Sequence, residues 1–344
     1  MCQVRARVYR RYWVFRRERR DSQIATERQL PAPLGGRPAS MNEFERLKLF
    51  SDVQRPPRFK DLEAMVSVRI VRNQIRLDYS LDYLRITGDS VLVPITLQVP
   101  NRDLEFRNVR GVHSTTLDVY ARITNMTGHV VQTFEDSVAR DFPESLFQKS
   151  LSLSSIYQKA VSLRPGLYKL NVVVKDEASG NVGTIETALR VPRYDEENLD
   201  ASSLILADQI EDLPTTQTGL GPFVIATRKV RPRLGREFSN AEKMGVFMQF
   251  YNLKLDDTTH KTSTDTTYRI TKGGLEVWRT EQRHQNGEQL TVQQMIPLTG
   301  LTPGRYTLQV RTKDDTAGQT IERTAEFTIK PDARTEAQDA TRKH

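Results

Sequence analysis

One stretch of the sequence decides the fold: Leu163-Arg-Pro-Gly-Leu-Tyr-Lys-Leu-Asn-Val-Val-Val-Lys-Asp176. It recurs 138 positions later as Leu301-Thr-Pro-Gly-Arg-Tyr-Thr-Leu-Gln-Val-Arg-Thr-Lys-Asp314, and eight of the 14 positions are identical. Solenoid proteins repeat with periods of roughly 20–50 residues, which is much shorter than this spacing. The repeat therefore indicates that one whole domain is duplicated in the chain.

The shared residues make physical sense together. Pro followed by Gly favours a tight turn, and Leu170 and Val172 then alternate with polar residues, as in a strand with one buried face. Leu-x-Pro-Gly-x-Tyr ahead of such a strand is typical of the tyrosine corner of immunoglobulin-like sandwiches. We therefore expect Tyr168 and Tyr306 to be structural anchors, each with its hydroxyl bonded to a backbone group upstream. The Lys-Asp pair should open a hairpin with a glycine at its tip.

Short alternating runs separated by turn residues surround both copies, a pattern typical of all-β sandwiches. The runs of the first copy are Val66–Ile70, Leu81–Ile86, Val91–Val99, Thr116–Ile123, Val130–Phe134, Leu167–Val174 and Thr184–Val191. Those of the second are Phe223–Val230, Val246–Leu253, Thr267–Thr271, Leu275–Thr280, Leu290–Ile296, Arg305–Thr312 and Ile321–Ile329. The predicted fold is all-β: two tandem immunoglobulin/fibronectin-like β-sandwiches with a short N-terminal helix and disordered termini. Pro143–Ser155 is expected to be a helical turn between strands.

The composition along the chain predicts the domain limits. They are an Arg-rich disordered tail (1–20), a linker (21–63) with a short helix at 42–52, a first sandwich (64–193), a linker (194–221), a second sandwich (222–331) and a disordered tail (332–344). Residues 203–207 are an alternative first strand of the second sandwich, or a strand that pairs with the first sheet. We expect the two sandwiches to be separate folding units.

The positive charge lies in one tail. The formal charge of the chain is +8, and it falls to +1 once the +7 of residues 1–20, with eight arginines and one glutamate, is set aside. Arginines interleaved with Tyr9, Tyr12, Trp13 and Phe15 could contact phosphates and bases. A nucleic-acid-binding domain should carry its charge on a folded face, so a solvated tail or a wrongly translated start is favoured. A nucleic-acid partner is not expected.

Cysteine and hydropathy set further limits. Cys2 is the only cysteine, which excludes an internal disulfide and a cysteine-based metal cage. No stretch approaches the 18 apolar residues of a transmembrane helix, and the basic start lacks the apolar run of a signal peptide. The localisation is therefore not given by this chain itself.

No catalytic, cofactor-binding or metal-binding residue is assigned, because the sequence holds no phosphate-binding loop, nucleophile elbow or zinc-peptidase motif. The five histidines are scattered and are expected on the surface: His113, His129, His260, His284 and His344. We therefore expect no enzymatic activity and no cofactor.

Three weaker patterns have alternative interpretations. The loop with Asp256, Asp257 and Asp265, and the hairpin residues Glu177 and Asp315, offer oxygen ligands for calcium, but solvated loops are favoured at both places. Asn125-Met-Thr127 matches a glycosylation sequon and also a hairpin turn. The aromatic residues Phe247, Tyr251 and Trp278 could form a sugar-binding platform, or else belong to the core.

Several segments resemble one family of bacterial proteins. They are Gly35-Gly-Arg-Pro-Ala-Ser-Met-Asn-Glu-Phe44, Phe59-Lys-Asp-Leu-Glu63, Val91-Leu-Val-Pro94, Val99-Pro-Asn-Arg-Asp103, Val131-Gln-Thr-Phe-Glu-Asp136, Arg164-Pro-Gly-Leu-Tyr168, Val191-Pro-Arg-Tyr-Asp195 and Ser202-Ser-Leu-Ile-Leu-Ala-Asp208. The chain is similar over about residues 22–330 to the GWxTD domain-containing proteins, especially those of Acidobacteria. The motif that names the family is absent, so the resemblance implies the C-terminal part of such a protein. It also implies a cell-envelope or extracellular setting for the intact protein, and an Arg-rich start read from another frame.

Two functions follow as expectations. The first is a non-enzymatic structural or interaction module of a bacterial envelope or extracellular protein, with an unknown protein or glycan partner. The alternative is a carbohydrate-binding appendage of a missing enzymatic domain. An exposed row of aromatic side chains would favour this alternative.

Overall fold

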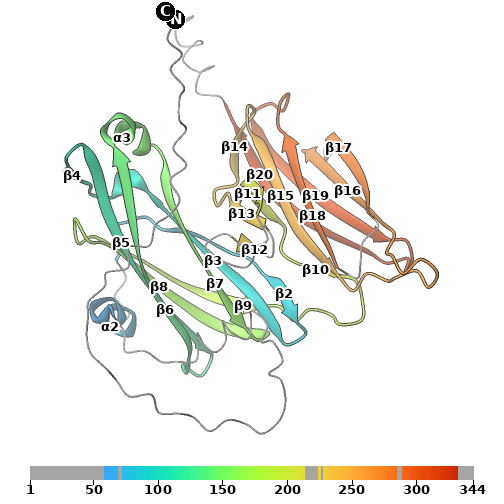
Figure 1. Cartoon of the computed structure of the whole chain (residues 1–344), viewed down its shortest axis with the longest axis horizontal. Coiled ribbons are helices and arrows are strands. Elements are labelled where there is room, and N and C mark those ends of the chain that lie inside the picture. Colours follow the sequence, from blue (N-terminus) through green and yellow to red (C-terminus); the bar gives the residue numbers. More distant parts are fainter. Residues whose placement is uncertain (1–57, 69–71, 214–223, 226–227, 285–288, 332–344) are drawn as a thin grey trace, which may run out of the picture. The chain divides into compact units, whose positions relative to one another are not determined.

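The computed structural model describes residues 58–68, 72–213, 224–225, 228–284 and 289–331. The expected helix at 42–52, the Arg-rich tail and the tail at 332–344 lie outside the described residues. The predicted fold class is confirmed, since the described residues form two tandem β-sandwiches (Figure 1).

The first sandwich packs two sheets around one apolar core. In one sheet, β3 (Ser90–Pro100) pairs with β7 (Ser154–Leu163) on one side and with β1 (Asp78–Leu81) and β2 (Leu84–Thr87) on the other. The second sheet has the order β9 (Val182–Val191), β8 (Gly166–Asp176), β5 (Val112–Asn125), β6 (Val130–Pro143), and β4 (Arg107–Val109) pairs with the start of β5. Alternate residues of β3, β5 and β8 fill the core, as the period-2 pattern predicts.

The second sandwich repeats this plan. Its first sheet centres on β15 (Lys243–Tyr251), which pairs with β18 (Leu290–Pro297) on one side and with β10 (Asp200–Ala201) and β11 (Ile205–Asp212) on the other. β13 (Arg228–Pro232) and β12 (Val224–Ile225) extend that sheet beyond β11. The other sheet has the order β14 (Glu237–Ser239), β20 (Thr320–Lys330), β19 (Gly304–Asp314), β16 (Thr264–Lys272), β17 (Leu275–His284). The repeated stretch thus supplies β8 and β19, which begin and end at equivalent positions.

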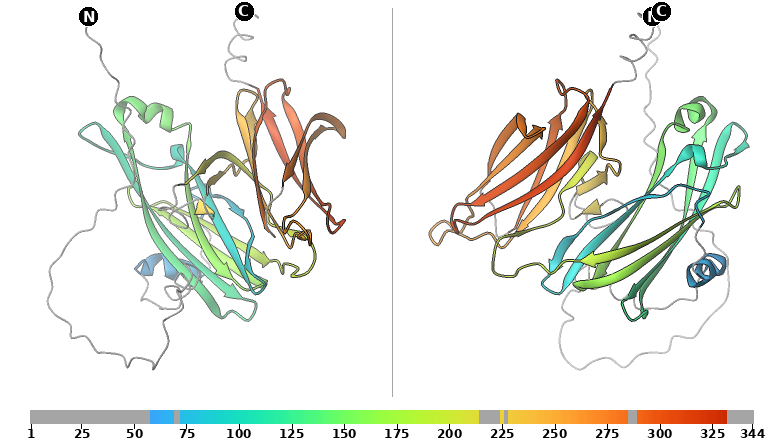
Figure 2. Two further views of the ribbon diagram at one scale, coloured as in Figure 1. Left: turned by 45° about the vertical axis from the view of Figure 1, so that its right-hand side comes forward. Right: turned by 180° about the vertical axis from the view of Figure 1, so that it is seen from behind.

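One predicted strand is a helix. The run from Val66 was expected to start the first sheet, but Lys60–Val68 form α2. Leu62 and Val66, four residues apart, are buried against Tyr120, Val173 and Val182 on the outer face of the β5–β8–β9 sheet, and Figure 2 shows α2 on this side. Apolar residues at i and i+4 lie on one face of a helix, whereas the alternation of Val66 and Val68 had suggested a strand. Val68 is 71% exposed.

The segment between β6 and β7 agrees with the expected helical turn, since α3 spans Glu144–Ser150. The strand that follows, β7, was not predicted. Each of its two faces carries a buried polar residue: on one face Ser155 Oγ donates to Asn101 Oδ1 at 2.7 Å, and on the other Gln158 Nε2 donates to Thr96 Oγ1 at 2.8 Å. These buried pairs hide the alternation by which a strand is recognised.

The predicted linker at 194–221 is partly strand, as the alternative at 203–207 predicted. Its described part contains β10 and β11, and both strands pair with β15 of the second sandwich. The apolar run Leu204–Ala207 is buried, which explains why this part of the chain is sheet. Ser203 is also hydrogen-bonded to the first sandwich: its N–H donates to Tyr83 O at 3.0 Å, and its hydroxyl accepts from Tyr83 N at 3.0 Å.

Candidate functional site

The repeated tyrosines form the predicted corners. Tyr168 Oη donates to Arg164 O at 2.9 Å, and Tyr306 Oη donates to Thr302 O at 2.6 Å. In both copies the acceptor lies four residues upstream, across the Pro-Gly turn. The surroundings differ: Tyr306 is buried and stacks on Phe327 with ring centres 5.5 Å apart, while Tyr168 is half-buried. Both tyrosines therefore hold the fold together, but with unequal burial.

The repeated aspartates are buried clamps. Asp176 and Asp314 are both fully buried at the end of β8 and β19. Asp176 accepts from Glu105 N at 2.9 Å and from Ala178 N at 3.2 Å, and Asp314 accepts from Lys254 N at 2.8 Å and from Thr316 N at 2.9 Å. Each carboxylate thus joins its own hairpin to a distant segment. The hairpin tips are Gly180 and Gly318, with φ of 74° and 69°, a conformation that favours glycine.

The environment of Asp176 favours its charged form. Burial by itself would raise the pKa of this carboxyl, but hydrogen bonds from Glu105 N, the hydroxyls of Ser179 and Thr115, and Ala178 N outweigh burial and lower the pKa. The carboxylate is therefore a structural charge satisfied by four donors.

Three of the candidate calcium ligands have other partners. Asp256 Oδ1 accepts from the backbone N of Thr258 and Thr259, at 3.0 and 2.8 Å, within its own turn. Asp265 Oδ1 lies 2.8 Å from Arg283 Nε. Asp315 Oδ1 lies 2.8 Å from Lys313 Nζ. The aspartates at these positions thus bond to the chain itself or to nearby cations.

Glu177, at the position equivalent to Asp315, has a raised pKa, because it is partly desolvated and lies beside Asp118. Within the described residues, no three Asp, Glu, His or Cys side chains are grouped as a metal site would require.

The sequon at Asn125 is a hairpin turn between β5 and β6. Asn125 Oδ1 accepts from Thr127 N at 3.0 Å, from Thr127 Oγ1 at 2.7 Å and from His129 N at 2.9 Å. The Asn and Thr side chains are therefore bonded to each other and order the turn.

The proposed aromatic platform is not exposed. Phe247 and Tyr251 are both 0% exposed, and Trp278 is partly buried against the core of the second sandwich. Tyr251 Oη accepts from Arg85 N at 3.0 Å. The carbohydrate-binding alternative needed an exposed row at these positions, and these residues do not supply it.

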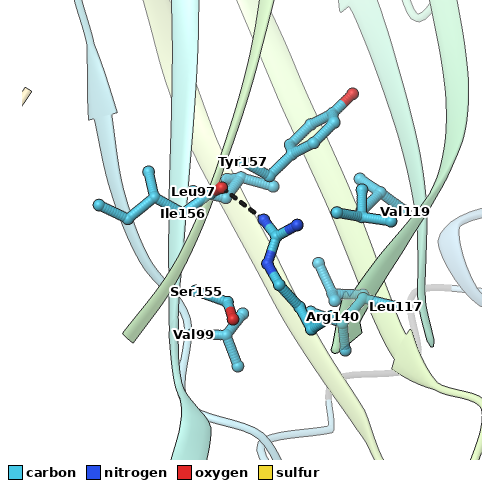
Figure 3. Close-up of a pocket in the computed structure, with 10 residues that line it drawn as sticks. Leu97, Val99, Leu117, Val119, Arg140, Ser155, Ile156 and Tyr157 are labelled. Carbon is cyan, nitrogen blue, oxygen red and sulfur yellow. Dashed lines mark hydrogen bonds between the residues drawn. The ribbon is translucent and has the colours of Figure 1, made fainter. Parts of the chain in front are cut away.

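A small cavity lies between the two sheets of the first sandwich (Figure 3). Its volume is about 10 Å³, which is room for about one water molecule. Leu97, Leu117 and Val119 line it, and Arg140 enters it from β6, where one guanidinium nitrogen donates to Ile156 O of β7 at 2.8 Å. Burial lowers the pKa of Arg140. This arrangement ties together two strands at the same side of the sandwich.

One surface with several exposed apolar residues lies at one end of the first sandwich, where the β4–β5 hairpin meets α3 (Figure 1). We call it the α3 tip and define it as residues 106–113 and 142–153. Four of its aliphatic side chains are exposed: Val109 at 62%, Leu146 at 54%, Leu153 at 53% and Val112 at 38%. Exposed apolar side chains gathered in this way mark interaction surfaces.

A polar network supports this tip. Glu144 N donates to Gly111 O at 2.9 Å, which fixes the start of α3 to the hairpin. His113 Nε2 lies 2.7 Å from Glu144 Oε2, and Asn108 Nδ2 donates to the same oxygen at 3.0 Å. The hydrogen bond with His113 lowers the pKa of Glu144.

Aromatic rings fill the space under the tip. The His113 ring stacks on Phe147 with centres 3.6 Å apart, and Phe106 meets Phe142 and Phe147 edge to face at 5.6 and 5.4 Å. His113 was expected on the surface, but the structure places its side chain, only 12% exposed, within this support. Hydrophobic periodicity predicts neither β4 nor the packing of α3. The sequence therefore held no signal for the place of His113 in this support.

Comparisons with known proteins give only distant likenesses. No protein-family model matches the chain, and no curated protein is similar to it. A crystal structure of red sea bream transglutaminase is similar with a TM-score of 0.22 and 8% identity, over 78% of this chain and 33% of that one. A tetra-tandem repeat from the extending region of a large adhesion protein is similar with a TM-score of 0.21 and 11% identity, over 74% of this chain and 49% of that one. The chain thus spans a third to a half of these structures, and such TM-scores carry no functional argument.

Described residues contain no helix that is both long and apolar enough to span a membrane.

Proposed function

We propose that this chain is a non-enzymatic interaction module whose binding surface is the α3 tip. The observation that carries the proposal is the group of four exposed aliphatic side chains on a frame fixed by the Glu144–His113–Asn108 network. A rigid apolar surface loses little conformational entropy when a partner covers it. The partner is a protein or a glycan.

The polar residues shared by both sandwiches support the same proposal. The carboxylates of Asp176 and Asp314 and the hydroxyls of Tyr168 and Tyr306 are hydrogen-bonded to backbone groups of the fold itself. What the duplication keeps is therefore a scaffold, while the surface features differ between the copies.

We also propose that the chain corresponds to the C-terminal part of a bacterial GWxTD domain-containing protein, in the cell envelope or outside the cell. The support is the set of sequence segments that resemble this family. Sequencing the DNA immediately upstream tests the assignment. A reading frame there that encodes Gly-Trp-x-Thr-Asp supports it, and an upstream region without that motif argues against it.

A capture experiment tests the binding surface. The immobilised full chain, the variant Val109→Ser/Leu146→Ser and the control variant Met126→Ser are incubated with a bacterial envelope fraction, and the retained proteins and glycans are quantified. Met126 is 73% exposed but lies beyond the opposite end of β5, away from the tip. We expect the retained amount of one set of ligands to be about tenfold lower for the tip variant alone, because this variant loses two aliphatic contacts. Equal retention by all three proteins would contradict the proposal.

A further inference from the structure

The free edge of β17 offers a second surface, independent of the α3 tip. β17 pairs with β16 and ends its sheet in the described part of the chain. An edge strand presents unpaired backbone N–H and C=O groups, which can pair with another strand. The question is which strand fits this edge.

The equivalent edge strand of the first sandwich directs two of its charged side chains across the sandwich. β6 is the equivalent strand, and its Arg140 crosses to Ile156 O of β7 at 2.8 Å. Asp136 Oδ2 of β6 accepts from Tyr157 Oη at 2.5 Å and from Lys159 Nζ at 3.1 Å, both on β7. These contacts direct the charges of β6 across the sandwich, where they are not available to another strand.

The charges of β17 are arranged differently. Arg279 and Glu281 contact each other along the strand, and their side chains are 51% and 59% exposed. Arg279 also lies directly opposite Arg269 of β16. Arg269 is paired with Glu276 at 2.7 Å, whereas Arg279 has Glu281 of its own strand. Because opposite charges across a sheet are favourable, a carboxylate on a neighbouring strand would give Arg279 a cross-strand partner.

We propose that β17 pairs antiparallel with β17 of a second copy of this chain, around a two-fold axis at Thr280. In this register Arg279 of each copy lies opposite Glu281 of the other, so both charged pairs are complementary. A symmetric interface of this kind uses the same surface patch on both subunits. The pairing would continue the β14–β20–β19–β16–β17 sheet from one copy into the next.

Charge reversal gives a sharp test with the full chain, measured by analytical ultracentrifugation over a range of concentrations. The wild type should show a monomer–dimer equilibrium. Arg279→Glu and Glu281→Arg should each weaken the dimer by about tenfold or more, because each places like charges opposite one another twice. An equimolar mixture of these two variants should recover dimerisation, and so should the double variant R279E/E281R. The control Arg305→Glu changes an exposed arginine of β19 in the same sheet and should leave the dimer unchanged.

Thermal unfolding of each variant confirms that it is folded. A wild type that stays monomeric at all concentrations would overturn the proposal. The same result is expected if the edge of β17 pairs with a strand of a different protein. A dimer that resists both single reversals would overturn it too. Weakening by the single variants without recovery in the mixture would reject the register centred on Thr280.

Discussion

The equivalent sheets of the two sandwiches differ on their outer faces. In the first, Tyr120 of β5 pairs with Val173 of β8, and both side chains are buried under α2 together with Val182 of β9. In the second, the same positions in the register hold Thr267, Arg311 and Thr320. The backbone plan of the two sheets is the same. The three apolar residues of the first sheet have polar counterparts in the second, and no helix covers that second sheet within the described residues.

This difference separates two kinds of residue in the duplication. The tyrosine corner and the buried aspartate occur in both copies, because they hold the turn and the hairpin of each sandwich in place. The outer face of the sheet differs between the copies, and its residues are apolar where a helix covers them and polar where none does in the described residues. The residues that differ between the copies are therefore the better guide to function.

The largest effect we expect distinguishes the two corners. Tyr306→Ala should lower the free energy of unfolding by about 3–5 kcal/mol, as for other buried aromatic residues. Tyr168→Ala should cost only about 1–2 kcal/mol, because its ring is half-buried. Denaturant unfolding of the full chain measures both. Equal costs would show that the difference in burial has no energetic consequence and that the corners are equivalent, as the sequence alone suggested.

Removing the covering helix should affect only the first sandwich. Leu62→Ala should destabilise the docking of α2 by about 2–5 kcal/mol, because Leu62 is fully buried on the sheet. Hydrogen exchange of the α2 amides measures this local stability. Val68→Ala is the matched control, since Val68 belongs to the same helix but is exposed. Similar exchange in both variants would mean that α2 does not depend on its buried face.

The buried aspartate of the first sandwich should give an acid-dependent loss of stability. The pKa of Asp176 is lower in the folded protein than its ordinary value of 3.8. The folded state therefore binds the proton less readily than the unfolded chain, and the stabilisation is present above about pH 4 and lost as the pH falls through the folded pKa. Unfolding measured from pH 7 to pH 2 should show this loss, and Asp176→Asn should reduce it. An unchanged pH profile in the variant would assign the acid sensitivity to other carboxyls.

The smallest expected effect concerns the start of α2. Glu135 Oε2 of β6 accepts from Arg58 N at 2.7 Å and from Phe59 N at 3.2 Å, just before the helix begins. Removal of such an acceptor costs about 1 kcal/mol. Glu135→Ala should therefore increase exchange of the α2 amides about fivefold, much less than Leu62→Ala. If Glu135→Ala increased exchange more than Leu62→Ala, the hydrogen bonds at the start of α2 would stabilise the helix more than its buried side chain does.

The sequence predicted the fold well because the duplication made its pattern visible twice. The turn, the tyrosine and the alternating strand could be assigned by comparing the copies at Leu163–Asp176 and Leu301–Asp314. Two elements of the first sandwich were harder to predict. α2 has an apolar spacing that fits helix and strand alike, and the buried positions of β7 include the polar residues Ser155 and Gln158.

The candidate site was not predictable for a related reason. The α3 tip joins residues 106–113 to residues 142–153, and its support depends on contacts such as His113 with Glu144 that cross 31 positions. Periodicity reports local structure and burial, whereas this surface is created by two distant segments. The free edge of β17 also becomes visible only once the strand order is known.

The aspartate clamps have a consequence for folding kinetics. Asp176 reaches Glu105 across 71 positions, and Asp314 reaches Lys254 across 60. Sheets built from such non-local contacts fold slowly, because long loops must close before the contacts form. A clamp between a hairpin and a distant segment forms only after the strands around it have paired. Its loss should therefore speed unfolding and leave the folding rate nearly unchanged. The two carboxylates then determine how long each sandwich stays folded more than how quickly it is made.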